Sequence, residues 1–481
     1  FYKRWFLVSK RQWMYVLHYQ AEMTNQPKKS NLKKVLGFPS LFAAAIGLVV
    51  AQTCFVSILQ GVGHGGSTFF IAIFIAFLLT LSYSVTYAEL SLMMPKAGSI
   101  STYTLTAIGP LPAIIATICG YVIPNIMLSP AELYLLEEIF GNLFPGFIIP
   151  VGFIVVLVFA ILNILGIDIF SKVQNVLAYA MIVALVIIGI SGLTKSATTE
   201  ITTLSFLKEI QMTDSSVFSL VVLALFAFMG LEFICPLLEE TKNPEKDIPK
   251  TFWWASVFLL ALYSMLALVG MRLFSANELL GSSTPHSLLV ETLYGKAGAI
   301  IMAVLAITAT STSINTVMAA VPRMMYGMAC NKQLPSVFMK LHPKWKTPWF
   351  SILVFALGIL ILGGIVRNSK DFVVLLMISA ASGWLITYII AHINVMMLRK
   401  KYPDFKRPFK SPLYPMPQLL GIAGMVYALI ENAPSPEIAK KANLIFLTFT
   451  GVTSVYAFLW VKLRMKKGLF ETEPINEVLD D

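Results

Sequence analysis

Residues 223–236 read LALFAFMGLEFICP, and this stretch decides how the chain folds. Gly230 and Pro236 interrupt a continuous apolar run, and Glu232 stands between them. Such a run belongs in a bilayer, where a helix satisfies its own backbone groups. A break there frees carbonyls that can accept from an ammonium group, and a half-helix N-terminus favours an anion. We therefore predict a broken membrane helix with a binding site; the alternative is a proline kink in which Glu232 pairs with a cation.

The composition extends this interpretation to the whole chain of 481 residues, of which 57% are hydrophobic and 13% are charged. Soluble domains carry about 25% charged residues, so this chain lacks the polar material for a water-facing surface. Its apolar residues form runs of about 20, the length that spans the bilayer core as a helix. They do not alternate with polar residues as in a membrane β-barrel. The expected fold class is an all-α integral membrane protein.

The apolar runs predict twelve membrane helices, at residues 37–60, 68–93, 111–139, 147–167, 172–193, 215–238, 252–274, 297–320, 348–366, 371–398, 415–432 and 442–463. Most of the 36 Lys and Arg residues fall in the two terminal segments and in every second connection. This bias places both termini in the cytoplasm of a multi-pass plasma-membrane protein. The net charge of +11 thus reflects topology, which argues against a nucleic-acid partner.

Polar residues in three other spans are further candidates. Gln52 and Thr53 in the first span could line a cavity or join two helices. Thr312 and Ser313, in a hydroxyl-rich stretch of the eighth span, could form a cation site or allow close helix packing. Glu132, deeper than the outer edge of the third span, could draw cations inward.

Several motifs follow one another between residues 31 and 465. They are Tyr87-Ala-Glu-Leu90, Pro95-Lys-Ala-Gly98, Phe226-Ala-Phe-Met-Gly-Leu-Glu232, Glu239-Glu-Thr-Lys-Asn-Pro244, Tyr326-Gly-Met-Ala329, Tyr402-Pro-Asp404 and Arg407-Pro-Phe-Lys410. Each is weak alone, but the ordered set resembles the amino acid–polyamine–organocation (APC) superfamily of transporters. The resemblance covers nearly the whole chain.

The resemblance implies two inverted repeats of five helices, at residues 37–193 and 194–398. Two further helices at 399–465 would follow, between cytoplasmic ends at 1–36 and 466–481. Helices 1 and 6 would be broken and would face a site at the middle of the membrane. The implied function is secondary active transport of amino acids or related amines by alternating access, not catalysis.

Carried over by position, the resemblance assigns substrate contacts to Ala51, Gln52, Thr53, Phe226, Ala227, Phe228 and Gly230. Glu232 would be the acidic gate or proton-coupling residue. The implied partners are the lipid bilayer, a small amine or amino acid, and a coupled proton or sodium ion. No cofactor is expected, and none of the five histidines has a second ligand at metal spacing.

Two departures bear on the function, the first on the substrate and the second on the coupling to protons. Members that bind α-amino acids usually carry Gly-Ser-Gly-Ile-Phe in helix 1, where this chain has Ala51-Gln-Thr-Cys-Phe55. The added Cβ atoms hinder close approach of a substrate carboxylate to the backbone. Some proton-coupled members place a lysine where Met181 stands. An alternative substrate is therefore a carboxylate-free amine such as ethanolamine or a polyamine, and an alternative of another class is a non-transporting scaffold or sensor.

Overall fold

The computed structural model describes residues 34–144, 146, 149–196, 216–367, 369–433 and 435–480. Within these ranges every regular element is helical, and the pairing of Leu36 with Thr241 is the isolated β-bridge. Most of the predicted N-terminal segment at 1–36 lies outside the described residues.

The first half of the chain forms α2 (Phe38–Val49), α3 (Gln52–Gly65), η1 (Gly66–Thr68), α4 (Phe69–Met93), α5 (Ile100–Ala107), α6 (Pro110–Thr117), η2 (Ile118–Val122), α7 (Ile123–Leu143), α8 (Val151–Leu165) and α9 (Ile167–Thr194). The second half forms α11 (Ser216–Phe228), η3 (Leu231–Glu240), α12 (Pro244–Leu273), α13 (Ala276–Gly281), α14 (Pro285–Tyr294), α15 (Lys296–Cys330), η4 (Ser336–Met339), α16 (Trp349–Val366), α17 (Lys370–Lys401), α18 (Met416–Ile430), α19 (Pro436–Trp460), η5 (Val461–Met465) and α20 (Ile475–Asp480).

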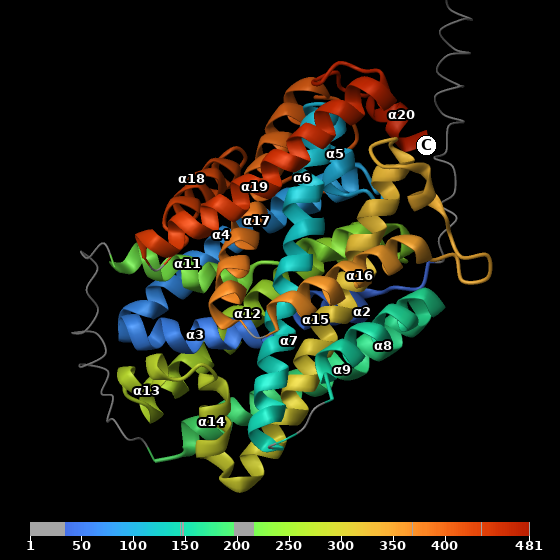
Figure 1. The fold of residues 1–481 in the computed structure, drawn as a ribbon. Helices are drawn as coiled ribbons and strands as arrows, with labels where there is room; N and C mark the ends of the chain where they lie inside the picture. Colours follow the sequence, from blue (N-terminus) through green and yellow to red (C-terminus); the bar gives the residue numbers. More distant parts are fainter. Residues whose placement is uncertain are drawn as a thin grey trace, which may run out of the picture.

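These helices confirm the predicted membrane fold. In the described ranges, nine helical stretches are long and apolar enough to cross a membrane, one of which runs through α3, η1 and α4. Three shorter apolar helices, α2, α8 and α18, accompany them. Because α2 with α3 and α11 with η3 each make one interrupted crossing, the elements fall at the twelve predicted spans. Figure 1 shows α2 and α3 end to end across the molecule.

The first helix breaks at Val50 and Ala51, which separate α2 from α3. Ala51 has an extended backbone (φ −86°, ψ 162°), a conformation open to any residue, so no glycine is needed here. The end of α2 is satisfied by Tyr263 of α12, whose hydroxyl donates to the Val49 carbonyl at 3.0 Å.

The sixth helix breaks at Gly230, which has a left-handed backbone with φ +118°. A side chain there would be strained, and its Cβ would come 3.2 Å from Leu48 Cδ2 of α2. The freed carbonyl of Phe228 accepts from the Tyr83 hydroxyl at 2.6 Å. Because α2 packs on η3 and α3 packs on α11, the two breaks lie side by side.

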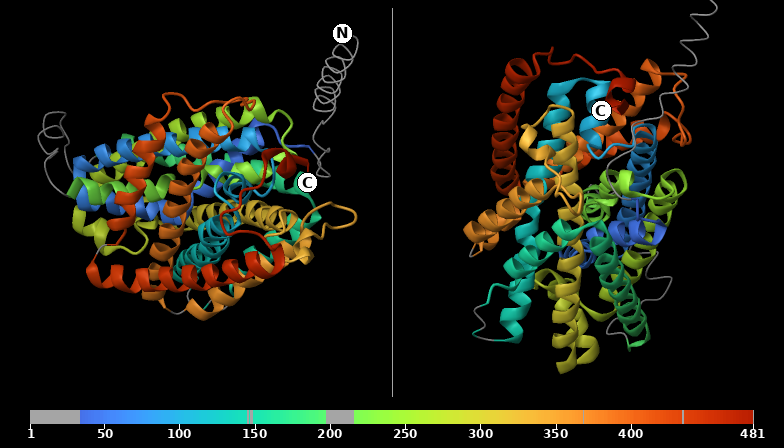
Figure 2. Two further views of the ribbon diagram at one scale, coloured as in Figure 1. Left: turned by 90° about the horizontal axis from the view of Figure 1, so that it is seen from above. Right: turned by 90° about the vertical axis from the view of Figure 1, so that its right-hand side faces the viewer.

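The start of the described chain (blue) and the C-terminal helix α20 lie at one end of the molecule, and α13 and α14 lie at the other (Figures 1 and 2). Near the first end, the Glu240 carbonyl accepts from the backbone N–H groups of Val35 and Leu36. Its buried carboxylate accepts from Arg323 of α15 at 2.6 and 3.0 Å. The bidentate pair thus joins η3 to α15, and the Glu240 carbonyl joins η3 to the residues before α2.

Candidate substrate-binding site

A cavity with about 470 Å³ of empty space lies at the two breaks. Its walls come from α2, α3, α7, α11, α15, α17 and the helix-6 break. They are formed by Leu48, Ala51, Thr53, Cys54, Asn125, Leu128, Ser129, Glu132, Phe226, Met229, Ser313, Val317 and Trp384. Transporters with discontinuous helices bind their solutes beside the helix breaks.

Glu132 of α7 is the one acidic or basic side chain among the described residues that line this cavity. It is 5% exposed and lies at the start of α3. Its Oε2 accepts from the backbone N–H of Gln52 at 3.2 Å, and its Oε1 accepts from that of Thr53 at 3.0 Å. The Thr53 hydroxyl donates to Oε1 at 2.6 Å. All three partners are donors, the arrangement that an ionised carboxylate makes.

Two polar side chains on α7 lie along the same wall as Glu132. The Asn125 amide donates to the Tyr121 carbonyl at 2.7 Å, and the Ser129 hydroxyl donates to the Asn125 carbonyl at 2.7 Å. The Ser129 hydroxyl uses its one hydrogen within the helix, and the Asn125 amide uses one of its two N–H groups there. The side-chain oxygens of both residues can therefore still accept hydrogen bonds. Together with Glu132, they make this wall a better partner for a donor cation than for an anion.

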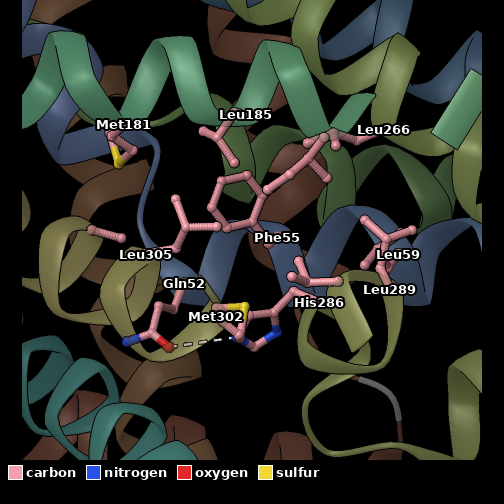
Figure 3. Close-up of a pocket in the computed structure, with 13 residues that line it drawn as sticks. Gln52, Phe55, Leu59, Met181, Leu185, Leu266, His286, Leu289, Met302 and Leu305 are labelled. Atoms are coloured by element: carbon pink, nitrogen blue, oxygen red, sulfur yellow. Dashed lines mark hydrogen bonds between the residues drawn. The ribbon is translucent and has the colours of Figure 1, made fainter. Parts of the chain in front are cut away.

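A second cavity, with about 490 Å³ of empty space, lies on the other side of α3 and is almost wholly apolar (Figure 3). Gln52 faces it and bridges two elements, donating to the Thr310 hydroxyl at 2.7 Å and contacting His286 Nε2 at 3.4 Å. His286 belongs to α14, in the connection before α15, and burial lowers its pKa to about 4. Met181 also lines this cavity. Of these two cavities, the first adjoins both breaks and has a carboxylate in its wall.

Glu232 lies behind the helix-6 break and lines neither cavity. It is fully buried, and the Tyr121 hydroxyl donates to its Oε1 at 3.3 Å. Tyr121 is also hydrogen-bonded to Tyr87 at 2.7 Å, and the Tyr388 hydroxyl nearby accepts from the Gly230 backbone N–H at 3.2 Å. Within the described part of the chain, no hydrogen-bond partner is found for the Oε2 atom of Glu232. Glu232, to which the resemblance assigned a gate role, thus lies in a cluster of tyrosines.

The remaining predicted residues divide between the cavity and the helix interfaces. Ala51, Thr53, Phe226 and Ser313 line the cavity with Glu132, whereas Gln52 lines the apolar cavity. Ala227, Phe228, Gly230 and Thr312 line neither, and the Thr312 hydroxyl donates to the Ala309 carbonyl of its own helix.

Sequence reasoning missed Asn125, Ser129 and Trp384 in the wall of the cavity. A signal existed for the first two, since residues 125, 129 and 132 follow the i, i+4, i+7 spacing of one helix face. Trp384 stands in an apolar run of α17 and carries no comparable signal.

Comparison with known proteins adds a family to this geometry. The family model described as amino acid permease matches residues 36–455. The chain is 27% identical over 416 residues to the serine/threonine exchanger SteT of Bacillus subtilis, covering 83% of this chain and 91% of that relative. It is 26% identical to the branched-chain amino acid permease BcaP of the same species, covering 84% and 89%. It is also 26% identical to the human cystine/glutamate transporter, covering 94% and 92%.

A crystal structure of a manganese transporter from Eremococcus coleocola shares the fold, with a TM-score of 0.61 at 12% identity over 90% of this chain and 98% of that one. That likeness supports the helical arrangement alone. The family match covers most of the chain, and curated relatives are membrane transporters that align over nearly their whole length. This chain belongs to the amino acid permease family of the APC superfamily and is a multi-pass membrane transporter.

Proposed function

We propose that this protein is a secondary active transporter that carries small amine-bearing solutes across the plasma membrane by alternating access. The observation that carries the proposal is the cavity at the two helix breaks, with Glu132 as its one charged wall residue. A cation of the size of an amino acid or a small amine finds there a carboxylate and the oxygens of Asn125 and Ser129. Ala51, Thr53 and Phe226 are the substrate contacts that we retain from the sequence.

The relatives support both transport and an amine-bearing solute. One is named a serine/threonine exchanger and another a cystine/glutamate transporter, so amine-bearing solutes are handled by similar chains. Amino acids therefore remain the broad substrate class, and a carboxylate-free amine is the narrower candidate. A scaffold or sensor role is disfavoured, because a charged cavity at paired breaks then has no use.

Alternating access needs a closure on each side of the cavity. At the end where the described chain starts, we place the closure at Glu240, which pairs with Arg323 of α15 and whose carbonyl bonds the residues before α2. At the other end, we place it at α14, whose His286 contacts Gln52 at the start of α3. In the predicted topology both termini are cytoplasmic, so α14 closes the outer side.

The coupling role falls to Glu232 in this proposal. It is buried beside the helix-6 break, and its Oε2 has no hydrogen-bond partner, so it can take up and release a proton as the break moves. Sodium bound at Thr312 and Ser313 is the second candidate, because the Ser313 side chain lines the cavity.

Uptake into proteoliposomes tests the proposed function. Vesicles loaded with unlabelled serine or ethanolamine should accumulate the same solute, labelled, from outside. If transport is coupled to protons or to sodium, a gradient of that ion should raise the initial rate of uptake. Empty liposomes provide the background. Rates equal to that background for amino acids and amines alike, with or without gradients, would reject transport of this class.

A further inference from the structure

We propose that Glu132 occupies the place where a substrate carboxylate would otherwise bind, so that the transported solute is a small cationic amine without a carboxylate. This inference rests on the proposed function and narrows its substrate class. It starts from an arrangement that the sequence did not predict, in which the Glu132 side chain of α7 caps the N-terminus of α3.

The start of α3 is the anion-binding end of a 14-residue helix, because its first N–H groups have no partner within the helix. The first two of these groups, from Gln52 and Thr53, donate to Glu132. The next two, from Cys54 and Phe55, donate to the Ala51 carbonyl. All four amides of the first turn are therefore occupied, and a ligand carboxylate would have to displace Glu132 to reach them.

The side chains at this break secure the arrangement. The Thr53 hydroxyl adds a third donor to Glu132 at 2.6 Å. Gln52 is turned away from the cavity, because its amide is held by Thr310 at 2.7 Å and by His286 at 3.4 Å. It is therefore not available in the cavity as a replacement donor for a substrate carboxylate.

The charge of the cavity points to the same solute. Glu132 brings one negative charge, and no Lys, Arg or His lies among the described residues of the wall. A zwitterionic amino acid would place a second carboxylate beside Glu132 in a medium of low dielectric, where like charges repel strongly. An ammonium cation without that group can donate to the carboxylate of Glu132 and to the side-chain oxygens of Asn125 and Ser129.

Pairs of ligands that differ only by the carboxylate test the inference. Ethanolamine is compared with serine, and 1,5-diaminopentane with lysine, by equilibrium binding to the purified full-length protein. For at least one pair, we expect the wild type to bind the amine at least ~10-fold more tightly than the amino acid. Glu132→Ala removes the carboxylate, so the affinity for the amine should fall at least ~10-fold. It also frees the α3 amides for a ligand carboxylate, so the preference for the amine over the amino acid should narrow or reverse.

Glu137→Gln is the matched control. Glu137 lies on the same helix but pairs with Arg367 at 2.9 Å and does not line the cavity, so its removal should leave the preference unchanged. If Glu132→Ala does not fold, Glu132→Gln keeps the shape of the side chain and should also lose amine affinity. Binding of serine and lysine at least as tight as that of the matching amines in the wild type overturns the inference but leaves the proposed function intact. Failure to bind or carry any of the four solutes removes both.

Discussion

The two helix breaks each hold a buried carboxylate, but the two carboxylates lie in opposite surroundings. At the helix-1 break, Glu132 accepts from three donors between 2.6 and 3.2 Å and lines the cavity. At the helix-6 break, Glu232 accepts from Tyr121 at 3.3 Å, leaves Oε2 without a partner, and lies outside the cavity wall. The first is suited to remain charged and attract a cation. The second is suited to change its charge.

The backbone of the two breaks differs in the same way. Ala51 adopts an extended conformation that any residue can take, whereas Gly230 adopts a positive φ of 118°. The first break therefore depends on side-chain contacts, above all those of Glu132. The second break depends on the glycine itself. Substitutions at the two sites should consequently fail in different measurements.

The largest expected effect is on amine binding by Glu132→Gln. Removing one partner of a buried, hydrogen-bonded charge pair costs about 2–5 kcal/mol, so we expect the Kd for an amine that the wild type binds to rise about 100-fold. Equilibrium binding to the purified protein measures this change. An unchanged Kd would show that the cation does not depend on Glu132.

Next in size is the loss of stability in Gly230→Ala. A non-glycine residue at this backbone conformation costs about 1–3 kcal/mol, and the new Cβ would meet Leu48 at 3.2 Å. A lowered thermal unfolding midpoint in detergent is the expected result. Gly141→Ala in α7 serves as the control. None of the described residues comes within 4 Å of the new Cβ, so this substitution should be neutral or slightly stabilising.

Glu232→Gln should alter transport more than binding. Because Glu232 lies outside the cavity wall, we expect the Kd for the amine to stay within about threefold. The maximal uptake rate should fall about 10-fold and lose its dependence on pH, since the proton carrier is gone. Proteoliposome uptake at several pH values measures both. Unchanged rates with an unchanged pH profile would remove Glu232 as gate and as carrier.

The smallest effect concerns the contact of α14 with the start of α3. The pKa of His286 is lowered from 6.5 to about 4 by burial, so the unfolded protein binds more protons between these values. The stability contributed by the neutral histidine is therefore complete above pH 6.5 and declines as the pH falls through this window. Between pH 7.5 and 5.5, the wild type should lose about 1 kcal/mol more free energy of unfolding than His286→Gln. Equal losses of unfolding free energy in the two proteins would contradict the burial of a neutral His286 against α3.

Much of the fold could be predicted from the sequence because a bilayer leaves few solutions. Apolar runs predicted the twelve membrane helices, and Gly230 predicted the break in the sixth. The break in the first helix was expected only from the resemblance to the APC superfamily. Ala51 carries no signal of its own, since an extended backbone places no demand on residue type.

The candidate site could be predicted only in part, because contacts between distant segments leave little trace in one sequence. Thr53 and Phe226 were identified by position, but Glu132 was expected to attract cations from farther out. Its contact with the α3 amides joins residues about 80 positions apart, and no local pattern encodes that pairing. Glu232 drew attention because it stands between Gly230 and Pro236 in an apolar run, although its side chain turns toward Tyr121.

A structure of the protein with ethanolamine or 1,5-diaminopentane bound, determined by electron cryo-microscopy in lipid nanodiscs, tests the central claim most directly. We predict that a ligand nitrogen lies about 3 Å from a Glu132 oxygen, with the amides of Gln52 and Thr53 still donating to Glu132. The same preparation with serine should leave the cavity free of ligand density. A serine carboxylate on those two amides, with Glu132 displaced from α3, would contradict the account.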